Sequence, residues 1–162
     1  MDKYTFFWKT MELCDWEREG NDDLVLEPVI TYLSSKEDAK IFEFENLMSE
    51  LLYALDTRKL AKQCKKSQGC FSEDDFLYSR CVALINGETY YRIALRGKFP
   101  RMWTMEFESL LDVAPRAWAL KHQKNESEYP NIPPVSYETG SNKKGWKKKL
   151  FIFSKALVTC YN

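Results

Sequence analysis

Several features that define common protein classes are missing from this sequence. Its only histidine is His122, and its five cysteines are odd in number and form no C-x-x-C pair, so no zinc site is predicted. No apolar run approaches the ~18 residues of a transmembrane helix, and no charged-then-apolar leader opens the chain. We therefore expect a soluble cytoplasmic protein that does not act at a membrane and holds no metal or other cofactor.

Signatures of common enzymes are also absent. The chain contains no G-x-x-x-x-G-K-[ST], G-x-G-x-x-G or G-x-S-x-G motif, which leaves phosphate-cradling loops and hydrolase elbows without support. Cys70 is a candidate nucleophile, but His122 is the only histidine that could serve it as a base. No family motif surrounds either residue, so we assign no catalytic residues and favour a protein that is not an enzyme.

The composition is that of a folded domain with uneven charge. A chain of 162 residues with 44% hydrophobic and 15% aromatic side chains can bury a core of its own. The net charge is zero, but residues 1–56 hold 14 acidic and 5 basic side chains, whereas residues 113–162 hold 3 and 9. Charge separation of this kind can steer a binding partner and says little about the fold.

Apolar residues recur at helical spacing through most of the first 124 residues. The strongest apolar face lies on residues 35–56. Pro28 implies either a kink in the second helix or a start near Glu27, and Pro115 should kink or divide the last helix. The serines at 34 and 35 fit capping boxes for the third helix. The predicted helices are 3–18, 21–33, 35–56, 60–66, 72–86, 88–96 and 104–118.

The stretch 69–87 is the one around which this helical pattern is arranged. Ser72 is a typical helix N-cap residue, and Asp75 fits a shortened capping box. The acids at 73–75 suit the positive end of the helix dipole. Arg80, about one and a half turns later, is predicted to form an ion pair with one of them. Apolar residues occur on more than one side of this helix, which predicts that it is covered on more than one side.

The same stretch resembles a bacterial family known as domain of unknown function 4240. The resemblance extends over roughly residues 3–120 and implies a helical fold, but it implies no activity. The chain departs from the family pattern at Phe71, which is inserted, and at Ser79, where an aromatic residue is usual. The similar residues are Phe6-Phe7-Trp8, Ile41-Phe42-Glu43, Leu52-Tyr53-Ala54-Leu55, Gly69, Cys70, Ser72, Asp74, Asp75, Phe76, Tyr78, Arg80, Ile85-Asn86-Gly87 and Tyr90-Tyr91.

The C-terminal part of the chain differs in character. Residues 125–145 are rich in Pro, Gly, Ser, Thr and Asn and predict a surface loop or extended arm. Residues 147–162 fit a strand, an extended tail or a short helix. The sequence therefore predicts an all-α, single-domain bundle of about six or seven helices over residues 1–124. Residues 125–162 should form an extended arm that packs on the same domain.

Two charged groups are candidate binding sites. The acidic candidates are Glu73, Asp74, Asp75, Glu37, Glu43 and Glu50. They would meet a basic protein, although helix capping and solubility account for them without a partner and are the favoured explanation. A carboxylate cluster such as 73–75 could also bind a divalent ion. The basic arm consists of Lys143, Lys144, Lys147, Lys148 and Lys149, interleaved with Trp146.

These candidates lead to two functional hypotheses. The first is a non-enzymatic protein-interaction module, an immunity or regulatory protein whose partner is another protein. The alternative is a nucleic-acid-associated module that uses the lysine arm, although a pI near 6.6 is low for this class. The sequence does not indicate an oligomeric state.

Overall fold

The structure, a computed structural model, describes residues 2–147 and is built from helices. It contains α1 (Lys3–Met11), α2 (Asp22–Ser34), α3 (Asp38–Leu55), α4 (Arg58–Gln68), α5 (Glu73–Ile85), α6 (Gly87–Leu95), α7 (Val113–His122) and α8 (Lys143–Trp146). Short 3-10 turns occur at η1 (Trp16–Arg18), η2 (Pro100–Thr104), η3 (Glu108–Asp112) and η4 (Glu126–Glu128). No strand occurs in the described residues, so the predicted all-α class is confirmed.

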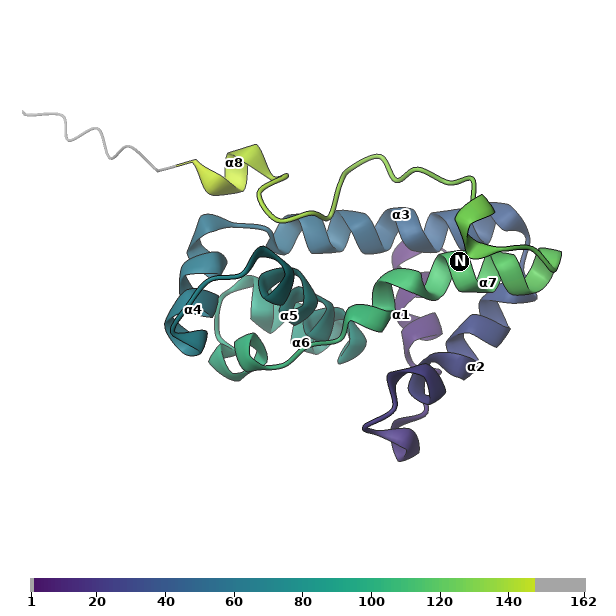
Figure 1. Cartoon of the computed structure of the whole chain (residues 1–162), viewed down its shortest axis with the longest axis horizontal. Helices are drawn as coiled ribbons and strands as arrows, with labels where there is room; N and C mark the ends of the chain where they lie inside the picture. The colour runs from purple at the N-terminus through teal and green to yellow at the C-terminus, as the bar shows by residue number, and fades with distance from the viewer. Residues whose placement is uncertain (1, 148–162) are drawn as a thin grey trace, which may run out of the picture.

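The longest helix, α3, is the one on which the others assemble. Helices α1, α5 and α7 pack against it, and Figure 1 shows α4, α5 and α6 toward one end and α2 and α7 toward the other. Its 18 residues correspond to roughly 27 Å at 1.5 Å per residue. Groups at its two ends therefore belong to separate regions of the surface.

Helix α5 is buried on nearly all sides. Every residue from Phe76 to Ile85 is buried except Tyr78, because α3, α6, η2 and η3 surround the helix. This confirms the prediction that the helix is covered on more than one side. An all-round buried helix also explains why its apolar residues do not form a single narrow stripe.

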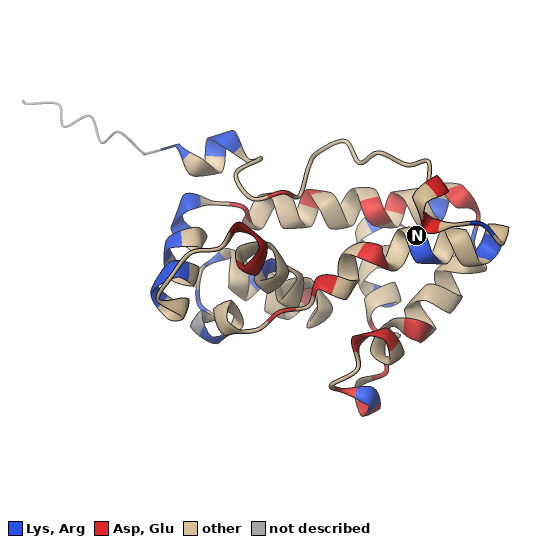
Figure 2. Ribbon diagram, in the orientation of Figure 1, with Lys and Arg blue, Asp and Glu red and all other residues tan. Residues whose placement is uncertain are grey.

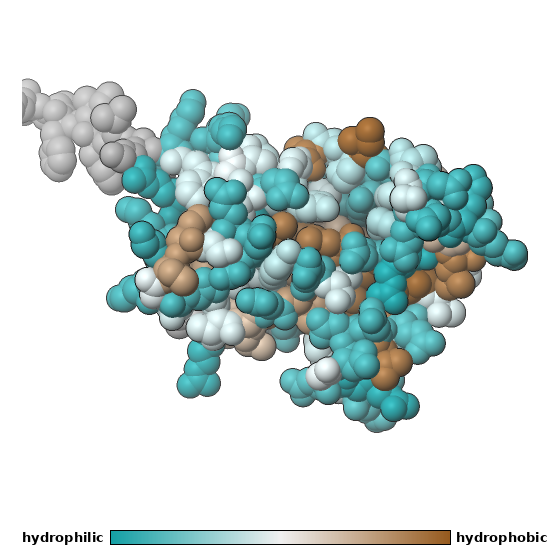
Figure 3. All heavy atoms as spheres, viewed as in Figure 1, coloured by the Kyte–Doolittle hydropathy of each residue, from teal (hydrophilic) through white to brown (hydrophobic). Residues whose placement is uncertain are grey.

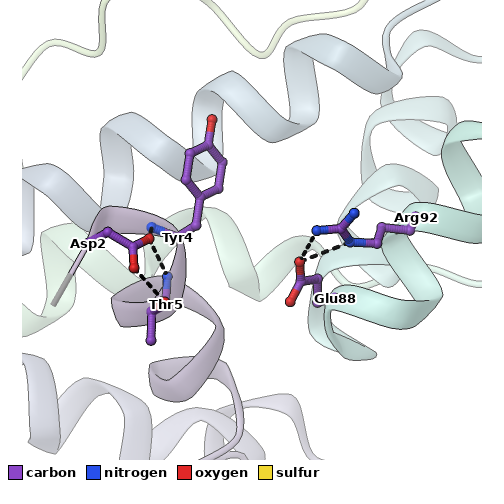
Figure 4. A network of polar contacts seen from close by, with 5 residues as sticks. All are labelled: Asp2, Tyr4, Thr5, Glu88 and Arg92. Atoms are coloured by element: carbon purple, nitrogen blue, oxygen red, sulfur yellow. Dashed lines mark hydrogen bonds and ion pairs between the residues drawn. The ribbon is translucent and has the colours of Figure 1, made fainter.

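Several helices begin next to a residue whose side chain caps the helix, as local sequence rules predict. The Asp2 carboxylate accepts the backbone N–H groups of Tyr4 and Thr5, both at 3.1 Å, at the start of α1 (Figure 4). Ser72 caps α5 by accepting the Asp75 N–H at 3.2 Å, as predicted. Figure 4 also shows the ion pair within α6 between Glu88 and Arg92, which fixes one turn of that helix.

Two predicted helix boundaries were wrong. The first helix ends at Met11 rather than residue 18, because the Asp15 amide bonds to the Val25 carbonyl and the Asp15 carboxylate caps the separate turn η1. The predicted capping boxes at Ser34 and Ser35 do not form. Their hydroxyls donate to carbonyls of the preceding turn and so end α2 instead of starting α3.

Helices α2 and α7 each contain a proline, and the structure shows where each of them begins. Helix α2 begins at Asp22 and continues through Pro28, so its start is not near Glu27. A third predicted boundary, the helix start at Thr104, was also wrong, because Thr104 ends η2 and the region is divided, with α7 beginning only at Val113. Pro115 then lies in the first turn of α7, where its missing N–H removes no intrahelical bond.

Residues 129–147 form a segment, here termed the C-terminal strap, that runs along α3 (Figure 1). Near its beginning, the Asn131 amide donates to Glu45 at 2.6 Å and to Asn46 at 3.0 Å. Near its end, the Asn142 amide donates to the Tyr53 carbonyl at 3.0 Å. The strap is thus attached near both ends of its course by polar groups of one helix.

Polar side chains cover most of the face drawn in Figure 3, with apolar residues exposed in small groups. Within residues 2–147, no helix has both the length and the apolar character that crossing a bilayer requires.

Candidate functional site

Helix α4 presents a row of positive charges to solvent. Its buried side consists of Leu60, Ala61 and Cys64, while Thr57 caps its start and Gly69 ends it in the left-handed conformation. The exposed side carries Arg58, Lys59, Lys62, Lys65 and Lys66. Five cations therefore share one short helix that contains no acidic residue.

This arrangement opposes ordinary helix electrostatics. Arg58 and Lys62, like Lys62 and Lys66, are like charges at i,i+4, which destabilise a helix by about 0.2–0.5 kcal/mol per pair. Arg58 and Lys59 also lie in the first turn, at the positive end of the helix dipole. Departures of this kind from local rules are expected where a surface serves a ligand.

The Asp56 carboxylate holds α8 beside α4 through hydrogen bonds. Asp56 is fully buried and directly precedes the Thr57 cap. One of its oxygens accepts the Trp146 indole N–H at 2.7 Å and the Gly140 N–H at 3.1 Å. The other accepts the Asn142 N–H at 2.9 Å and faces the Ser141 hydroxyl at 3.4 Å. The only described polar partners of this buried carboxylate therefore come from the strap.

The backbone at Gly145 also lies close to Asp56, which leaves no room for a side chain at this position. A Cβ atom at this position would lie 2.8 Å from the Asp56 carbonyl oxygen and 2.9 Å from the Asn142 amide nitrogen. Because a backbone carbonyl moves little, any side chain at 145 would push α8 away from α4.

The two segments enclose a basic groove of about 800 Å³. It is lined by Thr57, Arg58, Lys59, Lys62, Leu95, Lys144, Gly145 and Lys147. Five of these eight residues are cationic and none is acidic. Two lysines of the predicted arm, Lys144 and Lys147, therefore line one side of a groove whose other side is α4.

A smaller hollow of about 190 Å³ adjoins the basic groove. This aromatic slot is lined by Arg58, Ala61, Lys62, Lys65, Phe71 and Trp146. Arg58 and Lys62 line both spaces, so the two lie side by side along α4. The slot places exposed ring surface directly beside the cations.

The cations of the groove have no acidic partner. Among the described residues, none of the Lys and Arg side chains of α4 and of residues 143–147 forms an ion pair, although Lys59 donates to the Arg96 carbonyl at 3.1 Å. Figure 2 shows basic positions on α4 and α8, at one end of the molecule. Lys143 is exposed at the edge of this region, and Lys148 and Lys149 lie outside the described residues.

The predicted acidic candidates do not gather into one site. Glu43 pairs with Lys40, and Glu50 pairs with Lys3 at 2.6 Å, so two of them are neutralised within the chain. Glu37 is exposed at the start of α3. The remaining three, Glu73, Asp74 and Asp75, occupy the first turn of α5, as predicted for dipole-stabilising residues.

Arg80 corrects another prediction. It does not pair with the acids at the start of α5 but is fully buried, donating to the carbonyls of Phe76 at 3.3 Å and Leu52 at 2.9 Å and to the Thr139 hydroxyl at 3.0 Å. Burial lowers the pKa of the guanidinium, and the negative charge of Asp56 acts in the opposite direction. Arg80 is thus a link between the core and the strap.

Two further sequence hypotheses can be compared with the geometry. His122 bonds to Asp38 at 3.0 Å, at the start of α3, whereas Cys70 follows α4, which begins beyond the other end of α3. These two residues are therefore not placed as a nucleophile and its base. No group of three or more His, Cys, Asp or Glu suited to a metal ion occurs among residues 2–147.

Sequence reasoning missed the contribution of α4. A local signal was present, because residues 58–66 contain five basic and no acidic side chains. That run was hidden in the acidic balance of the larger N-terminal region. Its proximity to residues 143–147 depends on Asp56, for which no short-range pattern exists.

Comparison with known proteins identifies one relationship. A family model described as "Protein of unknown function (DUF4240)" matches residues 1–119. No curated protein and no solved structure matches the chain. The matched region includes α4, Asp56 and Arg80 but ends before the strap.

Proposed function

We propose that this chain, which belongs to the DUF4240 family of proteins of unknown function, is a nucleic-acid-associated binding module. Its basic groove would hold the sugar-phosphate backbone, with lysine and arginine side chains neutralising successive phosphates. No bond in the ligand needs to be made or broken for this role.

The observation that carries the proposal is the convergence of unpaired cations from two segments far apart in sequence. Arg58, Lys59 and Lys62 come from α4, and Lys144 and Lys147 come from the strap. Bringing these charges together without acidic partners raises the electrostatic free energy of the folded protein, and a polyanion would relieve that repulsion. Phosphate backbones carry the required regular spacing of negative charge.

The test is the salt dependence of binding to labelled oligonucleotides, measured by fluorescence anisotropy. If all five groove cations neutralise phosphates, log K should fall against log salt with a slope of about −3.5 for a single strand and about −4.5 for a duplex. The double variant Lys62→Glu/Lys144→Glu should weaken binding more than tenfold and flatten the slope.

A matched control makes the same change in net charge at positions outside the groove. Lys9→Glu/Lys36→Glu alters two lysines on and after other helices, outside the groove lining. Its affinity and salt slope should stay close to those of the parent protein. Absence of salt-dependent binding, or equal losses in both double variants, would contradict the proposal.

A second candidate, the protein-interaction module, is favoured by a different observation. Trp16 is 45% exposed and separates two hollows of about 390 and 370 Å³. Their linings include Glu12, Glu19, Asp22, Glu88 and Glu106 and no basic side chain. An exposed indole among carboxylates suits a Lys or Arg side chain of a basic partner, which also fits the hypothesis of an immunity or regulatory protein.

Binding of an arginine-rich peptide distinguishes this second candidate. Trp16→Ala should weaken the complex, mainly by speeding dissociation, while the Lys62→Glu/Lys144→Glu variant should not. Equal binding by the parent protein and Trp16→Ala would eliminate this surface as the site for a basic partner.

A further inference from the structure

The aromatic slot beside the basic groove suggests which form of nucleic acid the groove takes. The rings of Phe71 and Trp146 lie 6.4 Å apart at an interplanar angle of 70° and form an aromatic corner over Ala61. Phe71 is 37% exposed, which is unusual for a phenylalanine with a nearby core to join. Ring surface is therefore available to a ligand that occupies the groove.

Trp146 is held in place before any ligand arrives. Its indole N–H donates to the buried Asp56 carboxylate at 2.7 Å, and its ring meets Phe76 edge-on with centroids 6.4 Å apart. A ring already fixed by a hydrogen bond and by packing loses little conformational entropy when a second ring stacks on it.

The cations at the slot are placed for a ligand that is both planar and anionic. Lys65 lines the slot, and Arg58 and Lys62 line the slot and the groove together. A nucleotide has this combination, because its base is flat and its phosphate lies a few bonds away. Bases in a duplex are already paired and stacked between neighbours, so only an unpaired base can enter.

We infer that the groove prefers single-stranded nucleic acid and holds one unpaired base against Phe71 and Trp146, with the adjoining phosphates on Arg58 and Lys62. This inference rests on the proposed nucleic-acid binding. It adds a preference that phosphate contacts alone do not give, because the backbone charge is present in single strands and duplexes alike.

Phe71 is the better residue to replace, because a change at Trp146 would also remove a partner of Asp56. The variants are Phe71→Leu, which removes the ring, and Phe71→Tyr, which restores one. Tyr4→Leu removes an exposed aromatic side chain outside the slot and serves as the control. The probes are a labelled oligothymidine, a duplex of equal length and an oligomer of abasic sites, each measured over the same series of salt concentrations.

The parent protein should bind oligothymidine about tenfold more tightly than the duplex or the abasic oligomer. Phe71→Leu should lose that preference with an unchanged salt slope, Phe71→Tyr should regain it, and Tyr4→Leu should keep it. Equal affinity of the parent protein for all three probes, or full preference in Phe71→Leu, would overturn the inference but leave phosphate binding intact. Failure to bind any probe in a salt-dependent way would instead overturn the proposed function, as would equal competition by polyglutamate, which would assign the groove to acidic proteins.

Discussion

Arg80 and Asp56 carry opposite charges and are both fully buried, yet they bond to the same strap and not to each other. Arg80 donates to the Thr139 hydroxyl, which in turn donates to the Glu73 carbonyl at 2.8 Å. Asp56 accepts from the strap between Gly140 and Trp146. The core thus offers two charged anchors, and a single segment satisfies both.

The dependence of Asp56 on the strap leads to a prediction about truncation. A chain ending at residue 124, the predicted limit of the helical domain, would lose every described hydrogen bond of the Asp56 side chain. Water would reach the uncovered carboxylate and replace part of this bonding, so the expected loss is that of one or two hydrogen bonds to a charged group, about 1.5–3 kcal/mol each. Urea denaturation should show a loss of at least this order in the truncated chain. Equal stability of the full and truncated chains would contradict this account of Asp56.

Gly145→Ala tests directly whether α8 must lie close against Asp56. The added Cβ would meet the Asp56 carbonyl, so α8 should move outward and the groove should open. Hydrogen exchange of the 140–146 amides should accelerate, and oligonucleotide affinity should fall severalfold. Gly140 also has a positive φ, but a Cβ there meets no atom within 4 Å. Gly140→Asn, which tolerates that backbone conformation, is therefore the control and should leave affinity largely unchanged.

The buried carboxyl of Glu45 predicts a dependence of stability on pH. Burial raises its pKa, and the polar groups of Asn131 and Tyr129 act against that rise. A raised pKa means that folding favours the protonated form, so this contribution is complete below the unfolded pKa of about 4.3 and is lost as pH rises through the folded pKa. Relative to the parent protein, Glu45→Gln should therefore gain melting temperature between about pH 4 and pH 7. A difference that stays constant across this range would show that Glu45 does not titrate in this way.

The thiols should differ sharply in reactivity. Burial raises the pKa of Cys14 and Cys64 to about 11 and that of Cys81 to about 12, whereas Cys70 is exposed. Only thiolates react quickly with disulfide reagents, so these three should stay unmodified at about pH 8 in the folded chain. In a Cys160→Ser background, which removes the cysteine outside the described residues, one thiol per chain should react before denaturant is added. Rapid modification of a second thiol would mean that the core opens readily.

The cap at the start of α5 can be tested by stability alone. Ser72→Ala removes the acceptor of the Asp75 N–H and should lower the free energy of unfolding by about 0.5–2 kcal/mol. Ser72→Asp keeps an acceptor at the N-cap and should retain most of the stability. Chemical denaturation of the three proteins provides the comparison, and equal midpoints for all three would show that the cap contributes nothing.

These contacts also show what could be predicted from the sequence. The Ser72 cap follows from a rule that acts within one helical turn and was predicted correctly, whereas the helix predicted to start at Thr104 begins only at Val113. Arg80 was predicted to pair locally because a linear pattern shows only nearby acids. Its actual partners include a carbonyl 28 positions away and a hydroxyl 59 positions away.

For the same reason, the sequence indicated only one side of the groove. Lys143, Lys144 and Lys147 were chosen because they are close together in the sequence, while Asp56 belonged to neither group of candidate residues. Nothing local indicates that Trp146 will meet Asp56, so the contribution of α4 could not be inferred from the lysine arm.

The distance along the chain between Asp56 and Trp146 has a consequence for the order of events during synthesis. Ninety positions separate the two residues, so α4 and its cations emerge from the ribosome well before α8 exists. Contacts of such long sequence separation form late, since the intervening chain must first be ordered. A nascent chain would therefore carry the α4 charges without the completed groove. On the proposed function, the chain would bind nucleic acid with full affinity only after Trp146 had left the exit tunnel. This delay would limit its binding to the ribosomal and messenger RNA around it.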